Sequence, residues 1–190
     1  MNALDLRGLV SAPVTPFTRD GEVDHPAIQR LGSWLGSFKG VKGLVVLGHA
    51  GEGTFLTADE QTAVIESFIK SVKGKIPVIA GITLEGTKVA ALEAKRAVKA
   101  GAAAGLLYPS HGWLRFGYQK GAPQDRYRVI YEESGMPLIL SNVQSRDPAR
   151  DRSAAGCLRH EERCAQHAQV GHRDSDHPSR ASRSADSYLP

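Results

Sequence analysis

The fold is decided by residues 57–82, which read TADEQTAVIESFIKSVKGKIPVIAGI. In the first part, apolar residues recur three and four positions apart, as they do on the buried face of a helix. Thr57 and Glu60 have the spacing of a capping box, which starts a helix. Gly74 follows, where a left-handed residue commonly ends one. The continuous apolar run Ile76–Ile82 then predicts a strand buried on both faces. Helix, glycine and buried strand in this order predict one repeat of a parallel α/β fold.

The same repeat recurs through residues 1–140. Five apolar runs start about every thirty residues, which is the spacing of a strand–helix unit, and they predict five strands: Leu9–Val14, Leu44–Leu47, Ile76–Ile82, Leu106–Tyr108 and Pro137–Leu140. A closed (β/α)8 barrel and an open doubly wound sheet are both built from such units. The pattern alone does not choose between them.

The helical segments carry signals for their own ends. Pro26, two residues after Asp24, suits the first turn of a helix. One apolar face of that helix is predicted to contain Ile28, Leu31, Leu35 and Phe38. A glycine stands before each later strand and is predicted to end the preceding helix in the left-handed conformation; these glycines are Gly40, Gly74, Gly101 and Gly135.

The loop after the second apolar run reads GHAGEGT from Gly48 to Thr54. Two glycines three positions apart at the end of a strand let the backbone turn its N–H groups toward an anion. The helix that follows adds partial positive charge. A tight turn that binds nothing has the same spacing. Both interpretations stay open at this point.

Four segments together resemble the dihydrodipicolinate synthase/N-acetylneuraminate lyase family. In that family's order and spacing they are Val14-Thr15-Pro16-Phe17, Gly48-x-x-Gly51-Glu52, Pro77-Val78-Ile79-Ala80-Gly81 and Pro137-Leu138-Ile139-Leu140. The resemblance covers residues 7–140 and implies a (β/α)8 TIM barrel, usually tetrameric, of which residues 1–140 supply the first five units. It also implies carbon–carbon lyase or synthase chemistry on a 2-keto acid such as pyruvate, through a lysine Schiff base, with no metal or other cofactor.

The resemblance further implies where the keto acid binds. Its carboxylate is expected on the loop formed by Gly48, His49, Ala50, Gly51 and Glu52. His49 and Ala50 stand where the family usually carries hydroxyl residues, so two hydroxyl donors are replaced. His49 supplies a new donor there, or is an ordinary surface histidine.

Other candidate residues follow the first and fourth apolar runs. Thr15 matches a position where a hydroxyl joins a proton relay, although a strand-end threonine also serves to satisfy local backbone. Ser110 and His111 are expected to line the pocket. Either substrate choice or loop packing is expected of three more residues in this segment, which are Trp113, Arg115 and Tyr118.

The family's reactive groups are missing from the sequence after Leu140. A lysine on the sixth strand forms the imine in that family, and a tyrosine on the fifth strand shuttles protons. Here the last lysine is Lys120, and no tyrosine follows the fifth apolar run before Tyr188. The Schiff-base lysine and the fifth-strand tyrosine are therefore both absent, and we expect this chain to be inactive as an aldolase.

Residues 141–190 have a different composition, with eight Arg, four His and no Lys, Ile, Phe, Met or Trp. Such a segment is predicted to be disordered. Codons able to encode residues 160–169, read one base later, can encode Met-Lys-Asn-Gly-Val-Arg-Asn-Met, which resembles the family's segment around the lysine. We therefore interpret residues 141–190 as an out-of-frame tail that follows a barrel truncated or frameshifted after about residue 140.

Several other classes of function are weighed against this interpretation. The spacing of His160, Cys164, His167 and His172 is one that zinc tolerates, yet paired cysteines are lacking and no metal is expected. Acidic residues nearly balance the arginines, so no nucleic acid is expected. No apolar stretch reaches the length of a membrane span and no signal segment is evident, so a cytoplasmic protein is expected. The alternative to a catalyst is a non-catalytic half-barrel that binds a small carboxylate or a partner subunit.

Overall fold

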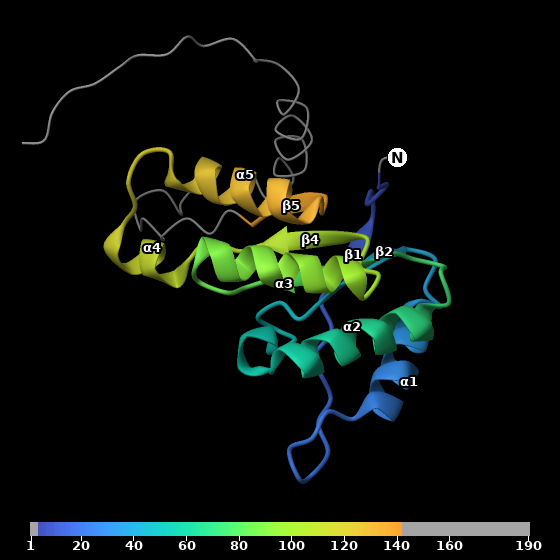
Figure 1. Ribbon diagram of the computed structural model, residues 1–190. Helices are drawn as coiled ribbons and strands as arrows, with labels where there is room; N and C mark the ends of the chain where they lie inside the picture. Colours follow the sequence, from blue (N-terminus) through green and yellow to red (C-terminus); the bar gives the residue numbers. More distant parts are fainter. Residues whose placement is uncertain (1–3, 142–190) are drawn as a thin grey trace, which may run out of the picture. The chain divides into compact units, whose positions relative to one another are not determined.

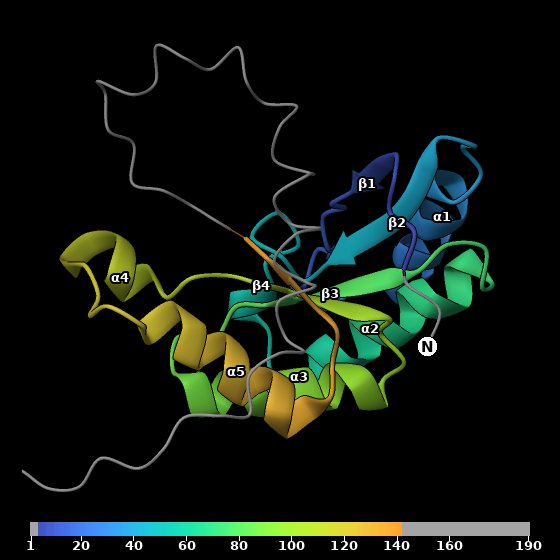
Figure 2. The same cartoon turned by 90° about the horizontal axis from the view of Figure 1, so that it is seen from above.

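Five parallel strands lie side by side in the order in which they occur in the sequence. The computed structural model describes residues 4–141, so the predictions for residues 142–190, namely disorder, a shifted reading frame and zinc ligands, lie outside the described residues. The strands are β1 (Leu9–Ser11), β2 (Val41–Val46), β3 (Val78–Ile82), β4 (Ala104–Leu107) and β5 (Leu138–Leu140). Each pairs with the next along the chain, as Figure 2 shows for the row as a whole.

This strand order answers the question that the sequence pattern leaves open. A doubly wound sheet reverses direction at its first strand, so that its first strand lies in the middle of the sheet. Here β1 lies at one edge, and the register runs in parallel from Leu44 opposite Val78 to Leu107 opposite Leu140. Sequential order throughout is the arrangement of a (β/α)8 barrel, and five strands make up a half-barrel.

Helices connect the strands and cover one face of the sheet (Figure 1). They are α1 (His25–Leu35), α2 (Ala58–Val72), α3 (Thr87–Lys99), the short α4 (His111–Phe116) and α5 (Ala122–Ser134), with a 3-10 turn η1 at Gly53–Phe55. The predicted capping box is present, because the Thr57 hydroxyl accepts from the Glu60 N–H and the Glu60 carboxylate accepts from the Thr57 N–H. Asp24 caps α1 by accepting from the N–H of Ala27 at 2.9 Å.

The core lies between the sheet and its helices. Alternate residues of β2 and β3 point toward the helices, where Leu44, Val46 and Ile82 meet Ile28 of α1 and Phe68 of α2, and all five are almost fully buried. The other face of the sheet carries a smaller cluster formed by Val45, Ile79 and Ala104. Both faces of the strands are therefore apolar, which explains why the sequence shows continuous apolar runs instead of alternation.

Two details of the predicted elements are wrong. Phe38 lies beyond the end of α1 and is exposed, with its ring edge-on to Trp34 at 5.1 Å, because the helix already ends at Gly36. Gly40 is not left-handed, whereas the other three predicted helix-ending glycines have positive φ. The strands begin or end up to three residues from the apolar runs, because an apolar run does not mark where the hydrogen-bonded ladder begins or ends.

Candidate functional site

The loops that follow β2, β3 and β4 lie together, because parallel strands end at the same edge of a sheet. Residues 47–56 follow β2, residues 83–86 follow β3, and residues 108–110 follow β4 before α4 begins. In this fold, binding sites are built from loops at this edge. All the substrate-binding residues predicted from the sequence lie in these loops or in the first turn of α4.

The β2 loop is folded tightly against the end of β3. Leu47 has a positive φ of 60° although its side chain is buried in the core. Its carbonyl oxygen is so close to two glycines that a Cβ on Gly53 would lie 2.1 Å from it, and a Cβ on Gly81 would lie 2.5 Å from it. Both positions therefore need glycine for the close approach of two backbones.

Thr15 fixes the same loop from the side of β1. Its buried hydroxyl donates to the carbonyl of Gly51 at 2.7 Å. Gly51 and Gly53 in turn donate their N–H groups to the carbonyl of Gly48, at 3.0 and 3.4 Å. The turn itself therefore uses the N–H groups of Gly51 and Gly53, and binding of an anion at this loop stays a prediction. Thr15 is a positioning residue in this structure, and its part in a proton relay stays a prediction.

Tyr108, at the end of β4, is a member of the site that the sequence reasoning missed. Its hydroxyl oxygen lies so close to Gly48 that a Cβ added at Gly48 would be 2.7 Å from it. Its ring lies edge-on to that of His49, with 4.4 Å between centroids. Burial raises the pKa of Tyr108, while the backbone N–H of His49 that bonds its oxygen has the opposite effect. The hydroxyl is therefore protonated at neutral pH and has a proton to donate.

Ser110 and His111 are held by Glu85 of the β3 loop. The Glu85 carboxylate accepts from the Ser110 hydroxyl at 2.5 Å, and from the His111 backbone N–H at 3.1 Å. It also bonds Nδ1 of the His111 ring at 2.6 Å. Partial burial raises the pKa of Glu85, but these hydrogen bonds outweigh it and lower the pKa to about 2. Glu85 is therefore ionised across the physiological range.

The predicted residues His49 and His111 meet across the site. Their Nε2 atoms are 3.2 Å apart, and their ring centroids are 5.2 Å apart. His49 is thus not an isolated surface histidine. Since it contacts Tyr108 and His111, it joins the loops after β2 and β4 into one cluster.

The β3 loop that carries Glu85 is anchored by two buried charged side chains. Arg126 of α5 donates to the carbonyls of Leu84 and Glu85, at 2.6 and 2.9 Å. Glu93 of α3 accepts from the N–H groups of Thr83 and Leu84, both at 3.0 Å. Burial raises the pKa of Glu93, and the hydrogen bonds to its carboxylate oppose that rise. Burial lowers the pKa of Arg126, and the neighbouring carboxylates oppose that fall. Side chains of α3 and α5 therefore form the hydrogen bonds that the backbone of this loop does not form within itself.

The segment after His111 packs on itself and on α5. The Trp113 ring lies 5.5 Å from that of Tyr118 and 5.9 Å from the guanidinium of Arg126. Arg115 lies over the ring of Phe116 at 5.4 Å. Of the two roles open to these residues, the contacts show loop packing, and a role in substrate choice stays a prediction.

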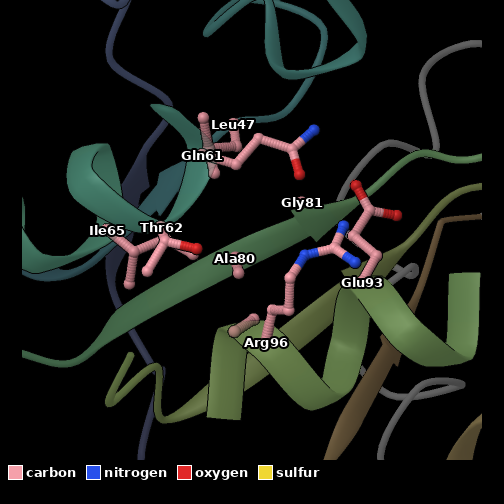
Figure 3. Close-up of a pocket in the computed structure, with 9 residues that line it drawn as sticks. Leu47, Gln61, Thr62, Ile65, Ala80, Gly81, Glu93 and Arg96 are labelled. Atoms are coloured by element: carbon pink, nitrogen blue, oxygen red, sulfur yellow. The ribbon is translucent and has the colours of Figure 1, made fainter. Parts of the chain in front are cut away.

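A small cavity lies apart from this site, between the sheet and helices α2 and α3 (Figure 3). Gln61, Glu93 and Arg96 bring polar groups to it, and Ala80 and Gly81 form its β3 wall. It has room for about one water molecule. Within residues 4–141 the buried Nε of Arg96 has no hydrogen-bond partner, and a water in this cavity would supply one. The cavity is too small for a substrate.

Glu85 and Arg126 also escaped the sequence reasoning. Neither belongs to a local motif, and each acts on loops that lie 25 to 42 positions away in the chain. A usable signal was the Tyr108-Pro109-Ser110-His111 segment itself, because a polar segment after a buried strand needs partners. The structure describes no group of three His, Cys, Asp or Glu side chains placed to hold a metal ion. None of the helices it describes has the length and apolar character needed to cross a membrane.

Comparison with known proteins agrees with this architecture. The model of the dihydrodipicolinate synthetase family matches residues 5–150. A 4-hydroxy-tetrahydrodipicolinate synthase from Maridesulfovibrio salexigens is 37% identical over 146 residues, which cover 75% of this chain and 47% of that protein. The enzyme of the same name from Xylella fastidiosa is 36% identical over 144 residues, covering 75% of this chain and 46% of that protein. The chain thus spans about half the length of the curated relatives it matches.

Solved structures also match this chain over about half of their own length. Dihydrodipicolinate synthase from Bacillus anthracis superposes with a TM-score of 0.67 at 26% identity, covering 80% of this chain and 53% of that one. The chloride-inhibited enzyme from Acinetobacter baumannii, complexed with pyruvate, gives 0.66 at 32% identity, covering 73% of this chain and 46% of that one. An N-acetylneuraminate lyase from Fusobacterium nucleatum shares the fold, with a TM-score of 0.64 at 22% identity, covering 73% of this chain and 47% of that one.

Proposed function

Since the chain belongs to the dihydrodipicolinate synthetase family, we propose that it binds a small 2-keto acid at the loops after β2 and β4 and forms no imine with it. The observation that carries the proposal is the meeting of His49 and Tyr108 at the edge where the family's sites lie. Pyruvate is the ligand of the related Acinetobacter baumannii enzyme, and it is the keto acid we expect here.

The donors proposed for the carboxylate differ from those that the sequence suggested. The Gly51 N–H is used within the turn, whereas the N–H of Ala50 donates to no backbone carbonyl of residues 4–141. The Tyr108 hydroxyl has a free proton, and the His49 ring adds a donor that carries positive charge when protonated. Together these groups replace the two hydroxyls that the family usually has at positions 49 and 50.

The absence of an imine is proposed from the lysines of the sequence. None follows Lys120. Among the described strands, Lys42 stands near the start of β2, which is the edge opposite the loops that form the site. The family's carbon–carbon lyase or synthase activity is therefore proposed for its longer relatives, and keto-acid binding without covalent catalysis is proposed for this chain.

Calorimetric titration with pyruvate tests the proposal. We expect saturable binding, and we expect Tyr108→Phe to weaken it about tenfold, because it removes a donor to a charged group. Tyr131→Phe is the matched control, since it removes a hydroxyl from an exposed ring of α5 stacked on Tyr127. Absence of binding, or equal losses in the two variants, would refute the proposal.

A second candidate is binding of a partner subunit. Within residues 4–141, β1 and β5 each pair on one side only. Leu9 of β1 and Leu140 of β5 are 61% and 43% exposed, and unpaired strand edges with apolar side chains favour association. Sedimentation analysis at rising protein concentration tests this: self-association supports it, and a strictly monomeric chain contradicts it.

A further inference from the structure

Three titratable side chains from three separate loops form a continuous chain of contacts. Glu85 follows β3, His111 starts α4 and His49 follows β2. The Glu85 Oε1 atom lies 2.6 Å from Nδ1 of His111, and Nε2 of His111 lies 3.2 Å from Nε2 of His49. Both ring nitrogens of His111 are therefore engaged, one by a carboxylate and the other by an imidazole.

The carboxylate sets the direction of this chain. A carboxylate is purely an acceptor, so it requires a proton on Nδ1 of His111. Neutral His111 then has its lone pair on Nε2, which can only accept from His49. His49 must in turn carry its proton on Nε2. The order of donors therefore runs from His49 to His111 to Glu85.

Hydrogen bonds fix Glu85 in the position that this order of donors requires. Its own backbone carbonyl and that of Leu84 are bonded by the buried Arg126. Its side chain also accepts from the hydroxyl and backbone of the Ser110–His111 segment. A carboxylate fixed at so many points keeps the attached imidazole in one tautomer and one orientation, which is the usual role of a carboxylate behind a functional histidine.

The charged and titratable groups around the relay are few. His49 faces Tyr108 of β4 and His111 of α4. Glu85 faces Ser110 and His111, with Arg126 on its backbone. When His49 takes up a second proton on Nδ1, the nearest charge that can compensate it through the relay is the Glu85 carboxylate. The resulting imidazolium has a donor left for an anion.

We propose that Glu85, His111 and His49 form a relay that makes His49 the cationic donor to the carboxylate of a bound keto acid, so that binding is coupled to proton uptake. Glu85 and His111 are positioning residues in this scheme. The inference rests on the proposed function for the identity of the ligand, while the relay itself is a property of the free protein.

The first arm of the test needs no ligand. Nitrogen-15 NMR of the histidine rings distinguishes a proton on Nδ1 from one on Nε2. We expect His111 to carry its proton on Nδ1 and neutral His49 on Nε2. In Glu85→Gln we expect the His111 preference for Nδ1 to be lost, and in Glu66→Gln, a carboxylate change on an exposed position of α2, we expect it to be kept. Unchanged tautomers in Glu85→Gln would overturn the relay even if pyruvate binds.

The second arm measures proton uptake with pyruvate. Titrations in buffers of different ionisation enthalpy give the number of protons taken up, and we expect net uptake at neutral pH. Affinity should fall as pH rises, because the proton that binding takes up becomes less available. Glu85→Gln should weaken binding about threefold at neutral pH, a modest loss because the pair is half exposed, and Glu66→Gln should not. Binding without proton uptake would overturn the coupling. Absence of pyruvate binding by the wild type would contradict the proposed function alone.

A third measurement excludes a metal site. A spacing of 3.2 Å between two imidazole nitrogens also suits two ligands of one tetrahedral ion, although the described residues offer no third ligand. Titration with zinc, followed by the same histidine signals, should leave both tautomers unchanged at micromolar metal. Micromolar zinc that shifts His49 and His111 together would assign the pair to a metal and overturn the relay.

Discussion

Replacing Gly53 by alanine tests how tightly the β2 loop is packed. The added Cβ would lie 2.1 Å from the carbonyl oxygen of Leu47, 2.8 Å from its carbonyl carbon and 2.9 Å from its Cβ. Contacts under 3.0 Å essentially never occur at a real Cβ, so the backbone of residue 47 or that of residue 53 must move by about 1 Å. Leu47 already has a positive φ of 60°, which leaves it little freedom to turn away.

The expected cost lies at the upper end of the range for overpacking, about 3 kcal/mol. For a domain of this size that corresponds to a fall of roughly 10 °C in the midpoint of thermal unfolding. Circular dichroism during heating measures it. Gly40→Ala is the matched control, because nothing lies within 4 Å of the Cβ it adds and Gly40 is not left-handed.

The loop should also lose its binding geometry, so Gly53→Ala should weaken pyruvate binding together with stability. A Gly53→Ala protein with the same unfolding midpoint as Gly40→Ala would refute the close approach of these two backbone segments. The account of the site as a rigid, preorganised loop would then fail with it.

Three further predictions concern the supports of the site. Thr57→Ala removes the cap of α2 and should lower the free energy of unfolding by about 1 kcal/mol, while Thr54→Ala at an exposed position should change it little; urea denaturation compares the two. Arg126→Met leaves two carbonyls without their donor and should cost about 3 kcal/mol, and a change below 1 kcal/mol in urea would contradict the anchoring role. The pKa of Glu85 is lowered from 4.5 to about 2, so its stabilising bonds are complete above pH 4.5 and are lost as pH falls toward 2. The protection of the His111 amide, measured as its hydrogen-exchange rate relative to the intrinsic rate at the same pH, should fall across that interval, and constant protection would contradict it.

Much of the fold could be predicted because its signals are local. The stripe of α2, its Thr57–Glu60 cap and the apolar runs of β2 and β3 all report on residues within one or two turns of each other. Strand ends were less accurate, since the apolar run extends beyond the hydrogen-bonded ladder in β1 and starts three residues into it in β2. Phe38 was misplaced because its apolar side chain fits the helical period, although α1 has already ended at Gly36.

The candidate site was predictable only in part. The loop of Gly48–Glu52 follows a strand and has a recognisable spacing, so its place in the fold could be read from the sequence. Its internal hydrogen bonds could not, because the spacing of Gly48 and Gly51 suits both an anion site and a tight turn, and only the structure shows that Gly51 and Gly53 donate to the Gly48 carbonyl. Glu85 and Arg126 depend on contacts between distant parts of the chain, which residue type alone does not reveal.

The proposed function of this chain is binding of a 2-keto acid without formation of a lysine imine. Incubation with pyruvate and sodium borohydride, followed by mass spectrometry of the intact chain, tests it most directly, because borohydride converts a lysine imine into a stable adduct. The account predicts an unmodified mass under conditions where calorimetry detects saturable pyruvate binding. A pyruvate adduct on any lysine of this chain would contradict it.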